Sequence, residues 1–134
     1  MNFIGIHGKN VKVFKTNKYK INWDAKSLSK VQFSAKRILY KYWLVDFVYE
    51  EFPVAGTRLK FDFFNASKSI VIEIDGNQHF EYNKFFHKGS KSNFINQIKR
   101  DEQKEKFCEL NKIILHRIRA DLDIEDQISQ LNLK

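Results

Sequence analysis

The chain has 134 residues, of which 43% are hydrophobic and 15% aromatic, and this composition supplies enough apolar surface for the core of one compact domain. Its single cysteine, Cys108, excludes an internal disulfide and a cysteine-based zinc site, and we expect it to be a buried core residue. No segment is long and apolar enough to predict a membrane span, and the first residues lack the pattern of a secretory signal. We therefore expect a cytoplasmic protein.

The formal net charge of +8 is distributed unevenly along the chain. Residues 1–41 contain ten Lys or Arg and one acid, Asp24, for a local charge of +9, whereas the rest has 14 basic and 15 acidic residues. A basic patch of this kind attracts polyanions, among which nucleic acid is the commonest large one in a cytosol. The alternative is a solvated face that only keeps the protein soluble.

The first elements are predicted within this basic region. Two alternating stretches in residues 10–23 flank the turn-prone KTNK and predict a basic β-hairpin. Its lysines are candidates for binding phosphates: Lys9, Lys12, Lys15, Lys18 and Lys20. Residues 29–43 then have apolar side chains at helical spacing with lysines opposite, which predicts an amphipathic helix capped by Ser27 or Ser29. We expect Lys36 and Arg37 of this helix to bind phosphates too.

A change to a period of two predicts three antiparallel strands in residues 46–54, 57–64 and 69–75, of which the third is apolar on both faces and therefore central. A helix from about residue 93 to Asn111, a strand at 113–119 and a short helix within 121–133 follow. The strand–helix–strand passage requires a parallel pair. The sequence thus predicts an α/β (α+β) fold with a mixed sheet of about four strands flanked by helices, residues 1–27 forming a hairpin extension and residues 28–134 the main unit.

Three carboxylates are predicted to gather at the end of the central strand. Glu73 and Asp75 are two residues apart and share one face, and Asp62 of the preceding strand lies opposite them. The three negative charges repel one another unless a proton or a cation lies between them. Hard oxygen ligands of this kind favour Mg²⁺ or Mn²⁺. His79 follows the turn at Gly76, within reach of the same pocket. The alternative is that these are solvated strand-end and turn residues.

A divalent cation beside a basic surface indicates phosphodiester cleavage. The residues FDFF around Asp62, EIDGNQH at 73–79 and KRDEQKEKFCELNKIILHRI at 99–118 together resemble the PD-(D/E)xK nuclease superfamily. Within it, they are most similar to very-short-patch-repair-like endonucleases, a group that includes phage-associated homing endonucleases of the EDxHD type. The resemblance covers residues 29–119 and implies a restriction-endonuclease-like fold, Mg²⁺ or Mn²⁺, and DNA as partner and substrate, in a bacterial or phage-infected cell.

The resemblance also implies a role for each matching residue. Asp62, Glu73, Asp75 and the backbone carbonyl of Ile74 would bind the metal. His79 would orient or deprotonate the attacking water. Further members of the site are implied as follows: Asp101 would hold His79 in its working tautomer, Lys104 would reach a phosphate, and Gln78 would contact DNA. Arg117 either touches DNA or pairs with an acid.

One position departs from the family pattern. The first helix of relatives has a glutamate where this chain has Lys36, and the nearby alternatives are Gln32 one turn earlier and Glu50 and Glu51 on the next strand. Either one of these strand acids supplies the missing carboxylate or the site is weakened. The sequence therefore leaves two alternatives to an endonuclease: a catalytically degenerate domain that binds DNA or a protein, and a branched-DNA resolvase acting as a homodimer.

Overall fold

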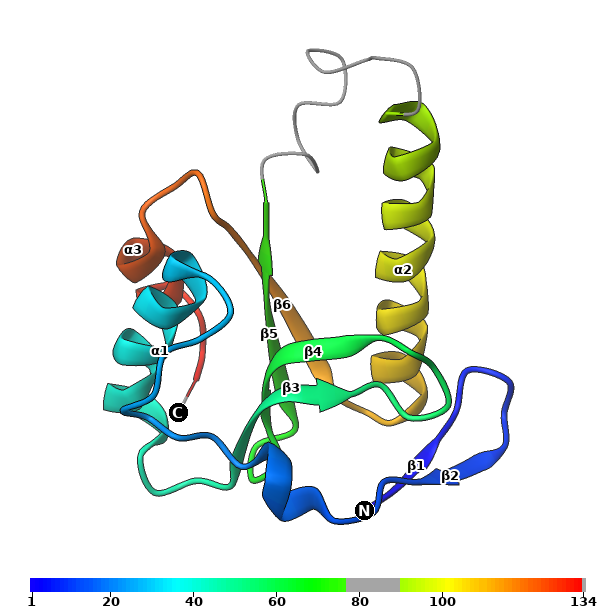
Figure 1. Cartoon of the computed structure of the whole chain (residues 1–134). Helices are drawn as coiled ribbons and strands as arrows, with labels where there is room; N and C mark the ends of the chain where they lie inside the picture. Colours follow the sequence, from blue (N-terminus) through cyan, green and yellow to red (C-terminus); the bar gives the residue numbers. More distant parts are fainter. Residues whose placement is uncertain (77–89, 134) are drawn as a thin grey trace.

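The computed structural model of the chain describes residues 1–76 and 90–133 (Figure 1). Within these ranges the elements are, in chain order, β1 (Asn2–Ile4), β2 (Asn10–Lys12), the 3₁₀ helix η1 (Thr16–Tyr19), α1 (Lys30–Trp43), β3 (Val48–Pro53), β4 (Lys60–Asn65), β5 (Ile70–Asp75), α2 (Ser90–Leu110), β6 (Ile114–Arg119) and α3 (Ile124–Ser129). None of the helices in the described ranges combines the length and the apolar character that a bilayer crossing requires.

The main sheet has the predicted mixed topology. Its strand order is β3-β4-β5-β6, in which the first three strands are antiparallel neighbours and β5 and β6 form a parallel pair. The chain passes from β5 to β6 through α2, the crossover that a parallel pair needs. The predicted fold class and the central position of the third strand, β5, are therefore confirmed.

Two apolar cores cover the two faces of this sheet. On one face, Phe3 of the N-terminal hairpin and Phe107 of α2 pack with Phe52, Phe61 and Phe64. On the other face, residues of α1 and α3 pack with the remaining inward side chains of the strands, as Figure 1 shows for the two helices on one side of the sheet and α2 on the other. Cys108 belongs to the first core and is 2% exposed, which confirms the prediction that it is buried.

The predicted N-terminus of α1 is correct. Ser29 is its N-cap, and its Oγ accepts a hydrogen bond from the Gln32 backbone N–H at 3.1 Å. This bond satisfies one of the backbone donors that a helix leaves unpaired in its first turn. Leu28 precedes the cap, lies outside the apolar face of the helix and is 81% exposed.

The predicted hairpin in residues 10–23 is wrong in its boundaries. The hairpin pairs β1 with β2, with Phe3 opposite Val11, and so uses the first residues of the chain. The stretch assigned to its second strand instead contains η1, followed by a single bridge between Lys20 and Tyr49 of β3. Lys15, with a φ of 52°, turns the chain out of the hairpin direction, which the alternating pattern of lysines and aromatics does not reveal.

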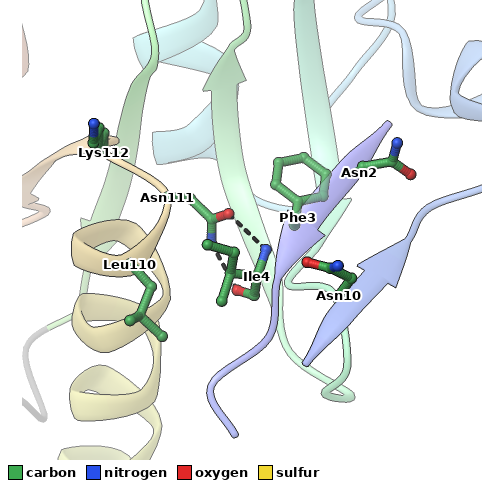
Figure 2. Close-up of a pocket in the computed structure, with 7 residues that line it drawn as sticks. All are labelled: Asn2, Phe3, Ile4, Asn10, Leu110, Asn111 and Lys112. Carbon is green, nitrogen blue, oxygen red and sulfur yellow. Dashed lines mark hydrogen bonds between the residues drawn. The ribbon is translucent and has the colours of Figure 1, made fainter. Parts of the chain in front are cut away.

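The C-terminal end of α2 holds this hairpin in place. The helix ends at Leu110, one residue before the predicted end at Asn111, and the left-handed conformation after it belongs to Lys112, with a φ of 55°. The Asn111 side chain instead pairs with the backbone of β1: its Oδ1 accepts from Ile4 N–H and its Nδ2 donates to Ile4 C=O, both at 2.8 Å (Figure 2). A side-chain amide thereby takes the place of a neighbouring strand.

Lys36 lies on the buried face of α1 and not on its solvent face. Its side chain is fully buried, and its Nζ forms an ion pair with Glu50 of β3 at 2.7 Å. The same ammonium donates to the backbone carbonyls of Asn22 at 3.1 Å and Ala25 at 2.7 Å. The prediction that Lys36 binds a DNA phosphate is therefore wrong for this structure, because all three N–H donors of its ammonium already bond to acceptors within the protein.

We predict that Lys36→Ala destabilises the fold by about 3–5 kcal/mol, because it leaves the Glu50 carboxylate buried without its cation. Lys41→Ala in the same helix is the matched control. Its ion pair with Glu125 spans 3.7 Å between side chains that are 67% and 69% exposed, so the destabilisation should stay below about 1 kcal/mol. Urea unfolding followed by circular dichroism measures both, and equal stabilities of the two variants would contradict this assignment.

Candidate active site

A row of charged residues crosses the main sheet at one level. The register of the neighbouring pairs, when it is continued, places Glu51 of β3 opposite Asp62 of β4 and Asp62 opposite Glu73 of β5. Glu73 itself pairs with Arg117 of β6. Three acids on neighbouring strands are thus followed by one base. We call these four residues the acid row.

The sheet bends at this row. Glu51 has a φ of 53°, a left-handed conformation that is rare for a residue with a side chain. The alternation of side chains breaks there: Glu50 bonds to α1 on one side of the sheet, whereas Phe52, two residues later, packs in the core on the other side. Strain of this kind persists only where the surrounding structure holds it, and it is concentrated at functional sites.

The acids themselves replace the backbone pairing that the bend interrupts. The ladder between β4 and β5 ends with Phe63 opposite Ile72. Beyond that pair, Asp62 N–H donates to Glu73 Oε2 and Ile74 N–H donates to Asp62 Oδ2, both at 2.7 Å. The two carboxylates therefore have fixed positions, each held by the neighbouring strand's backbone.

Burial and mutual repulsion disfavour the charged form of this pair. Desolvation, reinforced by the negative charges of Glu73 and Glu51, raises the pKa of Asp62 to about 8. Desolvation also raises the pKa of Glu73, although the Lys104 ammonium acts in the opposite direction. Both shifts favour a proton in the site, and a bound cation could take the place of that proton.

Two cations pair with acids here: Lys104, which comes from α2, and Arg117, the base of the row on β6. Lys104 of α2 forms an ion pair with Glu73 Oε1. Arg117 lies 3.4 Å from both Asp75 and Asp101, and its guanidinium also donates to the Asp101 carbonyl at 3.2 Å. Of the two alternatives for Arg117, pairing with acids is the one that the structure shows.

The structure brings only part of the predicted metal pocket together. Asp62 and Glu73 are adjacent, and Asp75 shares the face of Glu73 as predicted, but Asp75 pairs with Arg117 instead of joining the other two. Among the described residues there is no group of three or more Asp, Glu, His or Cys side chains arranged to hold a metal ion. A divalent cation fits the Asp62–Glu73 pair in its charge and its oxygen donors, and would need a further ligand from elsewhere.

Glu51, and not Glu50, is the strand acid whose charge acts on Asp62. Gln32 of α1 donates from Nε2 to Glu50 Oε2 at 2.9 Å and to Glu51 Oε1 at 3.0 Å. Glu50 is already committed to Lys36 and to Ser27, whereas the charge of Glu51 raises the pKa of Asp62. The sequence left Glu50 and Glu51 as alternatives for the missing carboxylate. Only the left-handed backbone of Glu51 and the strand register distinguish the two.

Some of the predicted site residues lie outside the described part of the chain. These are His79 and Gln78, so the predicted contact between His79 and Asp101 has no structural counterpart here. Asp101 is instead found next to Arg117 and within 3.3 Å of Gln97 Nε2. Their roles remain predictions.

The predicted phosphate-binding lysines are solvent-exposed: Lys9, Lys12, Lys15, Lys18 and Lys20, together with Arg37 of α1. The hairpin that carries the first of them is bonded to the end of α2 through Asn111, at the end of the sheet where β6 begins (Figure 1). Asp75, by contrast, is at the carboxyl end of β5. The hairpin lysines and the carboxylates therefore lie toward opposite ends of the strands.

We predict that Asp62→Asn makes the cation-free protein more stable, and increasingly so between pH 5 and 9. A buried acid whose pKa rises on folding contributes stability at low pH that is lost as the pH rises through the raised value, about 8 for Asp62. The expected gain at pH 9 is on the order of 1–3 kcal/mol, or roughly 3–10 °C in Tm.

Thermal unfolding in a chelating buffer at several pH values measures this gain. Glu125→Gln, which changes an exposed acid of α3, is the control and should follow the native protein at every pH. A gain that does not depend on pH would contradict the raised pKa of Asp62.

Comparison with known proteins gives relatives of uncharacterised function. The chain is 34% identical over 74 residues to uncharacterized protein 033L of Invertebrate iridescent virus 3, which covers 55% of this chain and 38% of that protein. It is 37% identical over 57 residues to uncharacterized protein 094L of Frog virus 3, covering 42% of this chain and 37% of that protein. The chain thus spans under two fifths of the length of these relatives. No family model and no solved structure matches it.

Proposed function

We propose that this protein is a metal-dependent DNA endonuclease that hydrolyses phosphodiester bonds at the acid row. The observation that carries the proposal is the Asp62–Glu73 pair, a half-buried and a buried carboxylate with raised pKa values held in fixed positions where β3 has a strained backbone. A fold that needed only stability would place apolar side chains there. Perturbed acids in such a setting are typical of catalytic sites.

The residues that would hold Mg²⁺ or Mn²⁺ are Asp62 and Glu73, with Glu51, whose charge acts on Asp62, as a further carboxylate and the Ile74 carbonyl as the ligand implied by the family resemblance. When bound, such a cation polarises the scissile phosphate and lowers the pKa of the attacking water. Lys104 offers positive charge beside the same carboxylates, where it can stabilise the charge that develops on the phosphate. His79 keeps its proposed role of orienting or deprotonating the water.

The supporting residues keep this arrangement rigid. Arg117 links Asp75 of β5 to Asp101 of α2, so that the helix bearing Lys104 is fixed to the strand bearing Glu73. Gln32 holds Glu51 from the α1 side of the sheet. Preorganised charges of this kind need no rearrangement when the reaction begins, which is how they accelerate it.

A domain of the same fold that binds DNA without cutting it is the second candidate. It is favoured by the ion pair between Lys104 and Glu73, because a protein cation already neutralises a carboxylate that a metal would use. A cleavage assay distinguishes an endonuclease from a domain that only binds DNA. A branched-DNA resolvase would be distinguished by its need for a homodimer and for branched substrates. We propose DNA as the partner in each case and the cytoplasm as the location.

We predict that the protein nicks or cuts supercoiled plasmid DNA in Mg²⁺ or Mn²⁺, and that Asp62→Ala lowers the rate by roughly 10²-fold or more while DNA binding persists. Glu125→Ala, the change of an exposed acid of α3, is the control for non-specific effects. Gel electrophoresis follows cleavage, and fluorescence anisotropy of a labelled duplex follows binding.

Two results would count against this site. Cleavage that survives Asp62→Ala would reject the acid row as the active site. No cleavage of supercoiled, branched, mismatched or single-stranded DNA, combined with intact binding, would favour the non-cutting domain.

We further predict that replacing the exposed lysines at positions 9–20 with glutamine weakens DNA binding and makes it less sensitive to salt. The slope of log affinity against log salt concentration should fall by about 0.9 for each phosphate that the variant no longer neutralises. Lys106→Gln, an exposed lysine of α2, is the control. Anisotropy titrations at several salt concentrations give both slopes. An unchanged slope would remove residues 9–20 from the DNA-binding surface.

A further inference from the structure

A second concave surface lies beside α1, outside the acid row. It is a cleft of about 320 Å³ between this helix and the preceding loop, a volume at the lower end for small-ligand pockets. Three of the side chains lining it are aromatic and two are charged: Trp23, Phe33, Tyr40, Asp24 and Arg37. Of these residues, only Arg37 already has a predicted role, that of binding a phosphate.

The aromatic rings of the cleft are accessible and have fixed orientations. Trp23 and Tyr40 meet edge to face, with ring centroids 5.6 Å apart and planes at 78°. Tyr40 is 43% exposed, and the Arg37 guanidinium lies over the Phe33 ring, 5.8 Å from its centroid. A flat ligand can therefore stack on an aromatic face here with an arginine beside it.

The buried Lys36 keeps the walls of the cleft together. It donates to the carbonyls of Asn22 and Ala25, the residues on either side of Trp23 and Asp24, and so holds this loop against α1. The Asp24 N–H in turn donates to Asn22 Oδ1 at 3.1 Å. A cleft with anchored walls loses little conformational entropy when a ligand enters it.

The charges of the cleft distinguish a base from a phosphate. Asp24 is the one acid among residues 1–41, in a region that otherwise has ten basic residues, and it lies in this cleft. A carboxylate repels a phosphate, but it accepts hydrogen bonds from the N–H groups at the edge of a nucleobase. Within the described residues, neither Asp24 nor Arg37 forms an ion pair, so both can meet the polar edge of a ligand.

We propose that this cleft binds an unpaired nucleobase of DNA by stacking it against Trp23 and Tyr40, with Arg37 and Asp24 at its polar edge. The basic surface around the cleft attracts the DNA strand. The rings then bind a base of any identity, because every base offers a flat face on which to stack. The proposal rests on the proposed DNA function and adds to it that the substrate has single-stranded or extruded nucleotides near the site.

The test compares a fluorescently labelled thymidine oligonucleotide with an oligonucleotide of the same length made of abasic sites, in a chelating buffer so that no cleavage occurs. We expect the native protein to prefer the thymidine strand. Tyr40→Ala and Trp23→Ala should each weaken its binding by about 5- to 100-fold and leave binding of the abasic strand unaffected. Tyr40 is partly exposed, so its replacement should disturb folding little, and thermal unfolding checks that both variants are folded.

Phe47→Ala is the matched control, because it removes a ring that is 66% exposed and lies outside the cleft. Equal affinities of the native protein for the two strands, equal weakening for both strands in Tyr40→Ala, or equal weakening in Phe47→Ala would each overturn the proposal. Because binding is measured without cleavage, an inactive acid row leaves this test intact. Conversely, normal plasmid cleavage with no base preference would reject the cleft alone.

Discussion

The buried ammonium of Lys36 is the interaction on which the acid row and the aromatic cleft both depend. In one direction it pairs with Glu50, whose neighbour Glu51 lies at the bend of the sheet, and Gln32 links the two acids. In the other direction it holds the loop of residues 22–25 against α1, where the aromatic cleft forms. A lysine is normally too costly to bury, and it is stable here because three acceptors satisfy its three donors.

On the opposite face of the sheet, basic side chains pair with the acids of β5. Lys104 and Arg117 approach Glu73 and Asp75 from the side of α2, while the apolar core farther along the helix, around Phe107, provides the packing. The helix is therefore held by aromatic burial near its end and by ion pairs nearer its middle. The acids would repel one another in this partly buried position, but cations from two elements lie beside them and offset that repulsion.

Much of the architecture was predictable from local patterns. Ser29 is a typical helix cap, the run of apolar residues before Glu73 marks a central strand, and residues two apart in that strand share a face. These features depend on near neighbours in the sequence. The hairpin was misplaced because Tyr19–Trp23 alternates as a strand would, whereas the paired strands include only three residues each, too few for a periodic signal.

The less predictable part of the site depends on contacts between distant residues. Periodicity places Lys36 with the other lysines of α1, and its burial follows only from Glu50 on another element. In the same way, nothing in the sequence separates Glu51 from Glu50; the register of β3 against β4 and the left-handed φ of Glu51 do so. The pairing of Arg117 with Asp101 likewise joins α2 to β6 and has no local signature.

The amide of Asn111 has a further consequence for how the molecule behaves in a crowded solution. A two-stranded ribbon such as β1–β2 leaves the outer backbone groups of each strand available, and such an edge can recruit a strand from another copy and start aggregation. Asn111 occupies the outer N–H and C=O of Ile4, on that edge. The side chain thus blocks the addition of a further strand at this position of the edge, and it does so without being part of a strand itself.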